Sequence, residues 1–140
     1  MVNIMKTYIK NNVGINEYMM YKHVQELNII NIPPIINYNE EKEILETEYI
    51  ENMNIADLYG EDPHEVPKEV FSKIRTMIKK LYENNIIYPD ITGYNFIKYG
   101  DNVWIIDFEH AHFIIESNCL KEYPTVSKFL NGETCWNYDL

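Results

Sequence analysis

The stretch from residue 86 to residue 109 constrains the fold of this chain more than any other part of the sequence. It reads as a polar loop that carries Asp90 and Asn95, then a short hairpin, and then an apolar strand that ends at Asp107. Two carboxylates and one amide, far apart in the sequence, are therefore expected to meet at one end of the hairpin. Hard divalent cations prefer oxygen ligands of this kind. The pattern predicts a site that holds a metal ion together with phosphate oxygens.

This pattern resembles the catalytic loop and the metal-binding segment of the protein-kinase-like superfamily. In that superfamily an Asn follows the catalytic Asp by five residues, and a later strand ends in Asp-Phe-Gly. Asp90 and Asn95 have this spacing, and Asp107-Phe108-Glu109 ends the strand here. The resemblance implies that Asp90 is the catalytic base and that Asn95 and Asp107 hold Mg²⁺. Tyr88 stands where kinases carry His, and Glu109 stands where they carry Gly.

A strand is expected over residues 2–9, with Val2, Ile4, Lys6 and Tyr8 on one face. A helix is expected over residues 17–27, capped by Asn16. Glu17 lies beside the apolar stripe of this helix and could reach a Lys on the packed strand. The resemblance implies that Lys6 and Glu17 form the kinase Lys–Glu pair, in which the Lys holds the nucleotide phosphates.

A hairpin is expected from residues 35–38 and 44–50, followed by a connection over residues 48–53. In the kinase-like interpretation this connection is the hinge whose backbone contacts adenine, and Thr47 lies at the back of the pocket. An ordinary hairpin with acidic tips would explain the same residues. The nucleotide-binding set implied by the resemblance is Lys6, Glu17, Ile4, Thr47, Glu48, Ile50 and Ile97.

Helical periodicity predicts a short helix over residues 54–59, ended by Gly60, and a long helix over residues 70–82. The charged residues of the long helix are expected to form a solvated face. A last helix is expected over residues 126–130, and the aromatic tail after it is expected to pack on the body of the protein.

The resemblance implies an α+β fold, a truncated bilobal kinase-like fold in a single domain over residues 1–140. Residues 1–53 form a reduced N-lobe with a small antiparallel sheet and helix C, and residues 54–140 form a reduced, mostly helical C-lobe with the catalytic-loop hairpin. Only five residues precede Lys6, so the Gly-rich loop of the family is expected to be missing. A second copy of the chain could complete the N-lobe. Asp90-Ile91-Thr92 looks more like atypical kinases, and the chain resembles small kinase-like proteins of large DNA viruses.

The net charge of −10 argues against sequence-independent binding to nucleic acid, whose phosphates attract positive surfaces. No apolar run approaches the roughly 20 residues that a membrane helix requires. The two cysteines lack the spacing of a zinc site, and nothing indicates secretion. A cytoplasmic protein without membrane or nucleic-acid partners is expected, in the host cytoplasm if the chain is viral.

Three functions remain open at this point. The first is an ATP- and Mg²⁺-dependent phosphotransferase whose acceptor is unidentified, a Ser or Thr of a protein being the expected class. The second is a pseudokinase-type module that binds nucleotide or a protein partner with weak or no catalysis. The third is a transition-metal site formed by Asp107, Glu109, His110 and His112.

Overall fold

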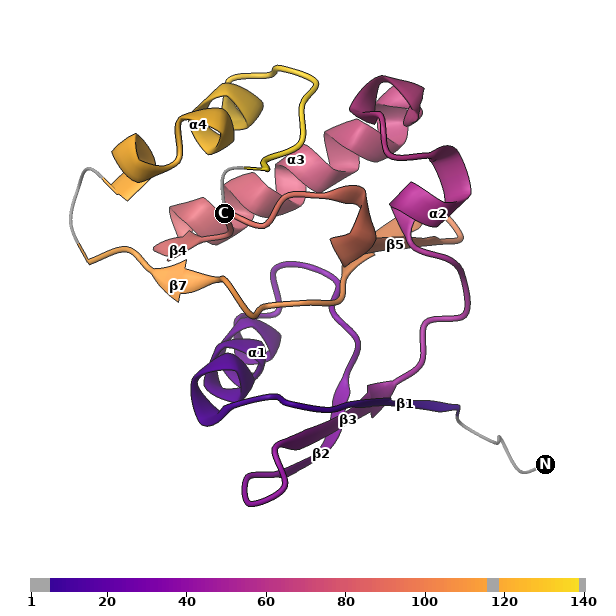
Figure 1. Cartoon of the computed structure of the whole chain (residues 1–140), viewed down its shortest axis with the longest axis vertical. Helices are drawn as coiled ribbons and strands as arrows, with labels where there is room; N and C mark the ends of the chain where they lie inside the picture. Colours follow the sequence, from indigo (N-terminus) through magenta and orange to yellow (C-terminus); the bar gives the residue numbers. More distant parts are fainter. Residues whose placement is uncertain (1–5, 116–118, 139–140) are drawn as a thin grey trace.

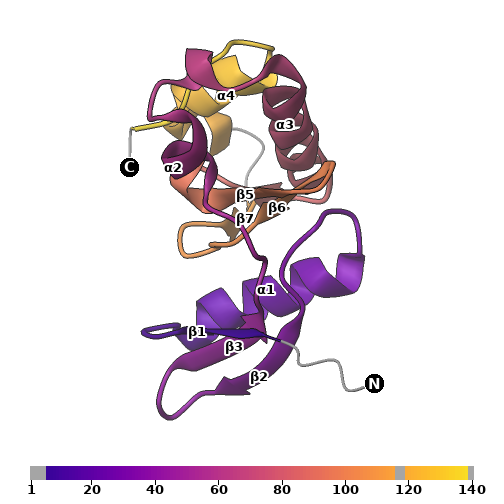
Figure 2. The same ribbon diagram turned by 90° about the vertical axis from the view of Figure 1, so that its right-hand side faces the viewer.

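The structure is a computed structural model that describes residues 6–115 and 119–138. Its N-terminal part is a three-stranded antiparallel sheet with one helix (Figures 1 and 2). The strands are β1 (Thr7–Lys10), β2 (Ile35–Asn39) and β3 (Ile44–Glu48), in the order β1-β3-β2. Helix α1 (Ile15–Leu27) lies between this sheet and the C-terminal part of the protein (Figure 2).

The hairpin of β2 and β3 confirms the prediction made from the sequence. The first strand differs, because β1 extends to Lys10, one residue beyond the predicted end. The part of that prediction on residues 2–5, including Ile4, lies outside the described residues.

Helix α1 begins two residues before its predicted start. Gly14 is its N-cap residue and provides no side-chain cap, so the predicted cap at Asn16 is wrong. Met20, Tyr21 and Val24 form its buried stripe, as helical periodicity requires. Asn28 ends the helix in a left-handed conformation, with φ of 51°, which Asn tolerates better than most residues.

The C-terminal part contains α2 (Ile55–Tyr59), the long helix α3 (Lys68–Glu83) and α4 (Pro124–Leu130). The side chain of Asn54 caps α2 by accepting a hydrogen bond from Asp57 N at 2.9 Å. All three predicted helices are present here, and α4 begins two residues earlier than expected. Short 3-10 helices occur as η1 (Pro63–Glu65), η2 (Gly93–Asn95) and η3 (Cys119–Glu122).

Two small antiparallel pairs complete the fold. Strands β5 (Phe96–Tyr99) and β6 (Asn102–Ile105) form the hairpin predicted around Gly100. Strand β4 (Ile86–Ile87) pairs with β7 (His112–Phe113), and this second pair was not predicted because two residues carry no readable alternation.

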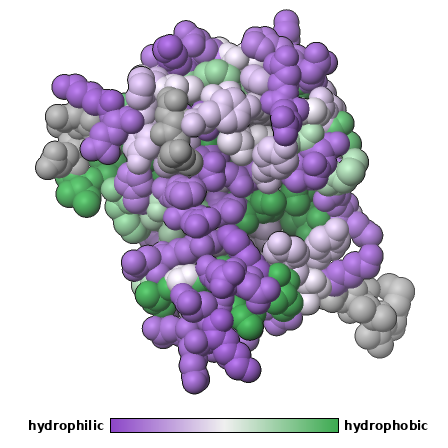
Figure 3. All heavy atoms as spheres, viewed as in Figure 1, coloured by the Kyte–Doolittle hydropathy of each residue, from purple (hydrophilic) through white to green (hydrophobic). Residues whose placement is uncertain are grey.

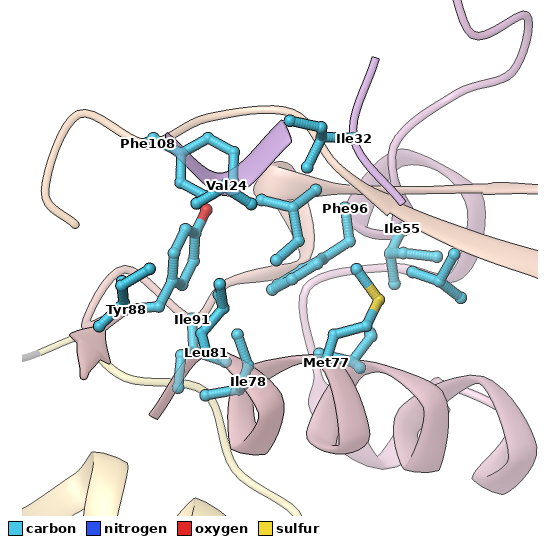
Figure 4. Packing of buried hydrophobic residues seen from close by; sticks show 14 of the residues in the cluster. Val24, Ile32, Ile55, Met77, Ile78, Leu81, Tyr88, Ile91, Phe96 and Phe108 are labelled. Atoms are coloured by element: carbon cyan, nitrogen blue, oxygen red, sulfur yellow. The ribbon is translucent and has the colours of Figure 1, made fainter. Parts of the chain in front are cut away.

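The core is continuous across both parts of the protein. Figure 4 shows Met77, Ile78 and Leu81 pointing from α3 toward the side chains around Ile91 and Phe96. Val24 from α1 and Ile32 from the loop before β2 belong to the same buried cluster. Each fully buried aliphatic or aromatic side chain contributes about 1.5–3 kcal/mol. The loop that carries Asp90 and Asn95 is thus attached to the hydrophobic core through Ile91 and Phe96.

Hydrophilic residues cover most of the face seen in Figure 3, with smaller apolar patches between them. One predicted solvated residue of α3 is not free in solvent: Arg75 donates to the carbonyl oxygens of Phe129 and Glu133, both at 2.8 Å. Its guanidinium also lies 5.2 Å from the ring centroid of Phe71. Among the described residues no helix is long and apolar enough to cross a bilayer.

Candidate functional site

The loop between β4 and β5 is folded by its own backbone and by contact with α2. Asn95 N donates to Thr92 O at 3.1 Å, which closes the turn of η2. Gly93 lies so close to α2 that a Cβ added there would be 2.9 Å from the backbone nitrogen of Ala56. Ile91, which is fully buried, fixes the loop to the core. The short segment from Asp90 to Asn95 therefore has little freedom to move.

Asn95 connects this loop to the strand that delivers Asp107. Its side-chain amide donates to Asp90 O at 2.8 Å, and its backbone oxygen accepts from Ile106 N at 3.0 Å. The side chain is nearly buried and lines a cavity between the sheet and the C-terminal part. Its Oδ1 accepts no hydrogen bond from the described residues and remains available to a ligand.

Asp107 follows β6 and is held by two buried tyrosines. Tyr21 donates its hydroxyl to Ile106 O, and Tyr88 donates its hydroxyl to Asp107 O. Burial raises the pKa of both phenols well above the ordinary value, so both remain donors at neutral pH. Asp107 Oδ1 accepts from Glu109 N at 2.8 Å. Tyr88, which replaces the kinase His, thus fixes the backbone at the predicted metal ligand.

The cation of the site is Lys10. Its Nζ lies 2.5 Å from Glu17 Oε2 and 3.1 Å from Asp107 Oδ1. The predicted pairing of Lys6 with Glu17 is wrong, because Lys6 pairs with Glu51 at 2.8 Å in an exposed position. The physical reason is the extent of β1. Alternate residues of a strand share a face, so the face assigned to Lys6 and Tyr8 continues to Lys10, which is one step closer to α1.

One ammonium group is shared between two carboxylates in this cluster. Burial acts to lower the pKa of Lys10, but its hydrogen bond to Glu17 and the charge of Asp107 outweigh burial, and the pKa is raised. The pKa of Glu17 is also raised, in this case chiefly by burial. The negative charges of Asp107 and Glu109 raise it further, and Lys10 opposes the shift. Lys10 therefore stays protonated, whereas Glu17 is harder to ionise than an exposed glutamate. Negative charge exceeds positive charge around Lys10, which favours the arrival of a further cation.

A cavity of about 180 Å³ adjoins this cluster between the sheet and the C-terminal part. Of the predicted nucleotide-binding residues, Thr47, Glu48, Ile50 and Ile97 line it. Asn95, Asp107 and Lys10 line the same cavity. Its remaining lining residues are Tyr8, Tyr21, Pro33, Leu45, Tyr49, Tyr94 and Ile106.

Three of the predicted residues do not line this cavity. Lys6 lies in a separate, shallower pocket with Tyr49 and Trp104. Glu17 reaches the cavity only through Lys10. Asp90 lies at the start of the turn that leads to Asn95. Its carboxylate makes no hydrogen bond or ion pair within the described part of the chain. Its backbone oxygen is fixed by Asn95 and by Thr92 N, so its position is set while its carboxylate stays free.

The donor set suits a hard divalent cation better than a transition metal. Asn95 and Asp107 offer oxygen ligands on one cavity wall, and Mg²⁺ usually takes one or two protein ligands together with phosphate oxygens. No three His, Cys, Asp or Glu side chains among the described residues lie close enough to hold a metal ion. His112 instead lies 3.1 Å from His110 O and packs on Tyr123. The alternative of a site at Asp107, Glu109, His110 and His112 is therefore not supported.

Comparison with known proteins gives a family and two relatives. The family model described as RIO domain matches residues 2–119. The KEOPS complex subunit Bud32 of Pyrococcus abyssi is 29% identical over 99 residues, which cover 71% of this chain and 44% of that protein. The EKC/KEOPS complex subunit BUD32 of Enterocytozoon bieneusi is 27% identical over 96 residues, which cover 61% of this chain and 47% of that protein. The chain thus spans about half the length of these curated relatives.

Proposed function

Because the chain belongs to the RIO domain family of atypical protein-kinase-like proteins, we propose that it is an ATP- and Mg²⁺-dependent phosphotransferase. We propose a truncated bilobal kinase-like fold, with residues 1–53 as the N-lobe and residues 54–140 as the C-lobe, and the small antiparallel sheets and four helices of the described residues are consistent with a truncated kinase-like fold. The nucleotide occupies the cavity between the two parts. Its adenine meets the connection after β3, near Glu48 and Ile50.

The observation that carries this proposal is the position of Lys10. Its ammonium is held by Glu17 and Asp107 on a cavity that Asn95 also lines. A phosphate chain in this cavity meets one fixed cation and, on the same cavity, the side-chain oxygens of Asn95 and Asp107, which suit Mg²⁺. Protein kinases use this combination of Lys, Glu, Asn and Asp for phosphoryl transfer.

The roles of the residues follow from their positions. Lys10 binds phosphate oxygens, and Glu17 orients Lys10. Asn95 and Asp107 would hold Mg²⁺, which supplies charge neutralisation to the transferred group. Asp90 accepts the proton of the incoming hydroxyl, which we propose belongs to a Ser or Thr of a protein.

Calorimetric titration of ATP, with and without Mg²⁺, tests the metal and nucleotide site. We expect binding that depends on Mg²⁺, and we expect Asp107→Asn to weaken binding of Mg·ATP by at least about tenfold, because the variant lacks one negative metal ligand. Asp101→Asn, at an exposed turn between β5 and β6, is the matched control and should bind like the parent. Equal binding by parent and Asp107→Asn would contradict the metal role.

A second candidate is a nucleotide-binding module that acts on a partner without efficient transfer. The observation that favours it is the position of Asp90, which does not line the cavity. The two relatives are named as subunits of KEOPS complexes, and by analogy we propose that this chain also has a protein partner.

Transfer from γ-labelled ATP separates the two candidates. If Asp90 is the base, Asp90→Asn should lower turnover roughly a hundredfold while the affinity for ATP persists, because shape is conserved and only proton acceptance is lost. A parent protein that binds Mg·ATP and turns over no faster than Asp90→Asn would support the binding module instead.

A further inference from the structure

The C-terminal segment contacts the loop of Asp90, and none of its described residues lines the cavity. Asn137 Nδ2 donates to Pro89 O at 2.6 Å, and Asn137 N donates to Ile91 O at 2.8 Å. These two carbonyl groups lie immediately before and after Asp90. Asn137 is almost completely buried, with 2% of its surface exposed. One residue therefore holds the backbone on both sides of the proposed base.

Trp136 fixes Asn137 in this place. Its ring is buried and packs against Phe71 of α3 and Phe96 of β5, with ring centroids 5.0 and 6.5 Å apart. Phe96 directly follows Asn95, so the tail and the exit of the loop share one aromatic contact. Figure 1 shows the tail returning from α4 past α3 to this position.

The beginning of the tail is fixed by α3. Arg75 donates to Phe129 O at the end of α4 and to Glu133 O in the tail. The tail is thus attached at Glu133, Trp136 and Asn137, and it reaches the loop as an ordered segment.

The buried loop carbonyls require such a partner. Pro89 and Ile91 are buried, and a buried carbonyl group without a hydrogen bond costs about 1–3 kcal/mol. Pro89 O also accepts from Ile91 N at 2.9 Å, and the bond to Ile91 O comes from the backbone N of Asn137, so the side chain of Asn137 acts on Pro89 O. A side chain at position 137 that repels Pro89 O would displace this carbonyl group and the Asp90 backbone next to it.

We propose that Asn137 is a positioning residue for Asp90, through its hydrogen bonds to Pro89 and Ile91. This inference rests on the proposed phosphotransferase function. The family match ends at residue 119, so the match does not assign a role to the tail. Asn137 touches neither nucleotide nor acceptor, and it acts only through the loop backbone.

The test is Asn137→Asp, which keeps shape but replaces the amide donor with an oxygen that repels Pro89 O. We expect turnover of ATP to fall between about tenfold and a hundredfold, since a displacement near 1 Å can cost that much. The affinity for Mg·ATP should fall less than turnover, because Lys10 and Asp107 come from other elements and only Tyr94 and Asn95 of this loop line the cavity. Asn131→Asp makes the same chemical change at an exposed position of the same segment and should leave turnover unchanged.

Hydrogen–deuterium exchange of the loop amides gives a second measurement that does not depend on catalysis. In Asn137→Asp we expect faster exchange at Thr92 and Asn95, with the amides of α3 unchanged. Unchanged turnover together with unchanged loop exchange would overturn the proposal. A loss of turnover that urea denaturation traces to global unfolding of the variant would overturn it as well. If the parent itself shows no turnover, the proposed function fails. Faster exchange confined to the loop would then still support the positioning role, and unchanged exchange would refute it.

Discussion

At the scale of single residues, Lys10 is the residue that we propose binds phosphate. It is the cation that the structure brings to Glu17 and Asp107, whereas Lys6 pairs with Glu51 outside the cavity that Asn95 and Asp107 line. We expect Lys10→Met to weaken ATP binding by at least about tenfold, because a charge-assisted contact to phosphate contributes about 1.5–3 kcal/mol.

Lys6→Met is the matched control for this experiment. It removes the same charge from the same strand region and should leave the ATP dissociation constant within about twofold. Calorimetric titration of both variants measures the two effects. A stronger loss in Lys6→Met than in Lys10→Met would return the phosphate role to Lys6.

Glu17 gives the site a characteristic dependence on pH. Its pKa in the folded protein is raised above the ordinary value of 4.5, chiefly by burial. As pH rises through this region the unfolded chain releases the proton first, so the folded state holds more protons and the free energy of unfolding falls. The contribution of Glu17 is therefore most favourable below its unfolded pKa and is lost as pH rises through the raised pKa.

Glu17→Gln isolates this contribution, because other carboxylates titrate in both proteins. We expect the free energy of unfolding of the parent, minus that of the variant, to decrease as pH rises from acidic to neutral. Urea denaturation at a series of pH values measures it. A difference that stays constant over this range would show that Glu17 has an ordinary pKa.

At the scale of elements, the contact between α2 and η2 holds the loop of Asp90 and Asn95 in place. Gly93 leaves no room for a side chain, because its nearest neighbour is the backbone of Ala56, which cannot rotate away. We expect Gly93→Ala to lower stability by about 1–3 kcal/mol, as overpacking does, and to lower turnover by displacing Asp90 relative to Asn95. Urea denaturation and transfer from labelled ATP measure the two effects.

Gly14→Ser is a suitable comparison. A Cβ at Gly14 meets only a side-chain oxygen of Glu43 at 3.4 Å, and Ser is a favourable N-cap for α1. This variant should retain both stability and turnover. Full activity in Gly93→Ala would show that the loop position does not depend on the contact with α2.

The helices and strands were easier to predict from the sequence than the contacts between them. The hairpin of β5 and β6, the helix α3 and the position of Asp107 after an apolar strand depend on local alternation and periodicity, and the sequence predicts them. The partner of Glu17 was missed because alternation identifies a face of a strand but not where the strand ends. The sequence did indicate this partner, because Lys10 follows Lys6 and Tyr8 at alternate positions and therefore lies on the same face of the strand. The solvated role predicted for Arg75 was wrong because its partners are backbone groups, which no sequence pattern marks.

At the scale of the whole molecule, one continuous core joins the sheet, α1 and the helices of the C-terminal part. The site lies where these parts meet, and its residues come from β1, α1, the loop before β5 and the end of β6. Spacing along the chain indicated Asp90, Asn95 and Asp107 because they belong to neighbouring segments. The contact of Asn137 with the loop depends on the complete packing of α4 and the tail, so the sequence predicted only that an aromatic tail packs on the body.

The contact between the tail and the loop also has a consequence for biosynthesis. Domains fold while the ribosome adds about 5–20 residues each second, beginning from the N-terminus. When Asp90 leaves the ribosome, the residue that bonds Pro89 and Ile91 has not yet been made. The nascent chain can form its sheet and α3 before this point, but the loop of Asp90 lacks two hydrogen-bond donors until Asn137 emerges, on the order of a few seconds later. The order of synthesis thus delays completion of the site relative to formation of the core.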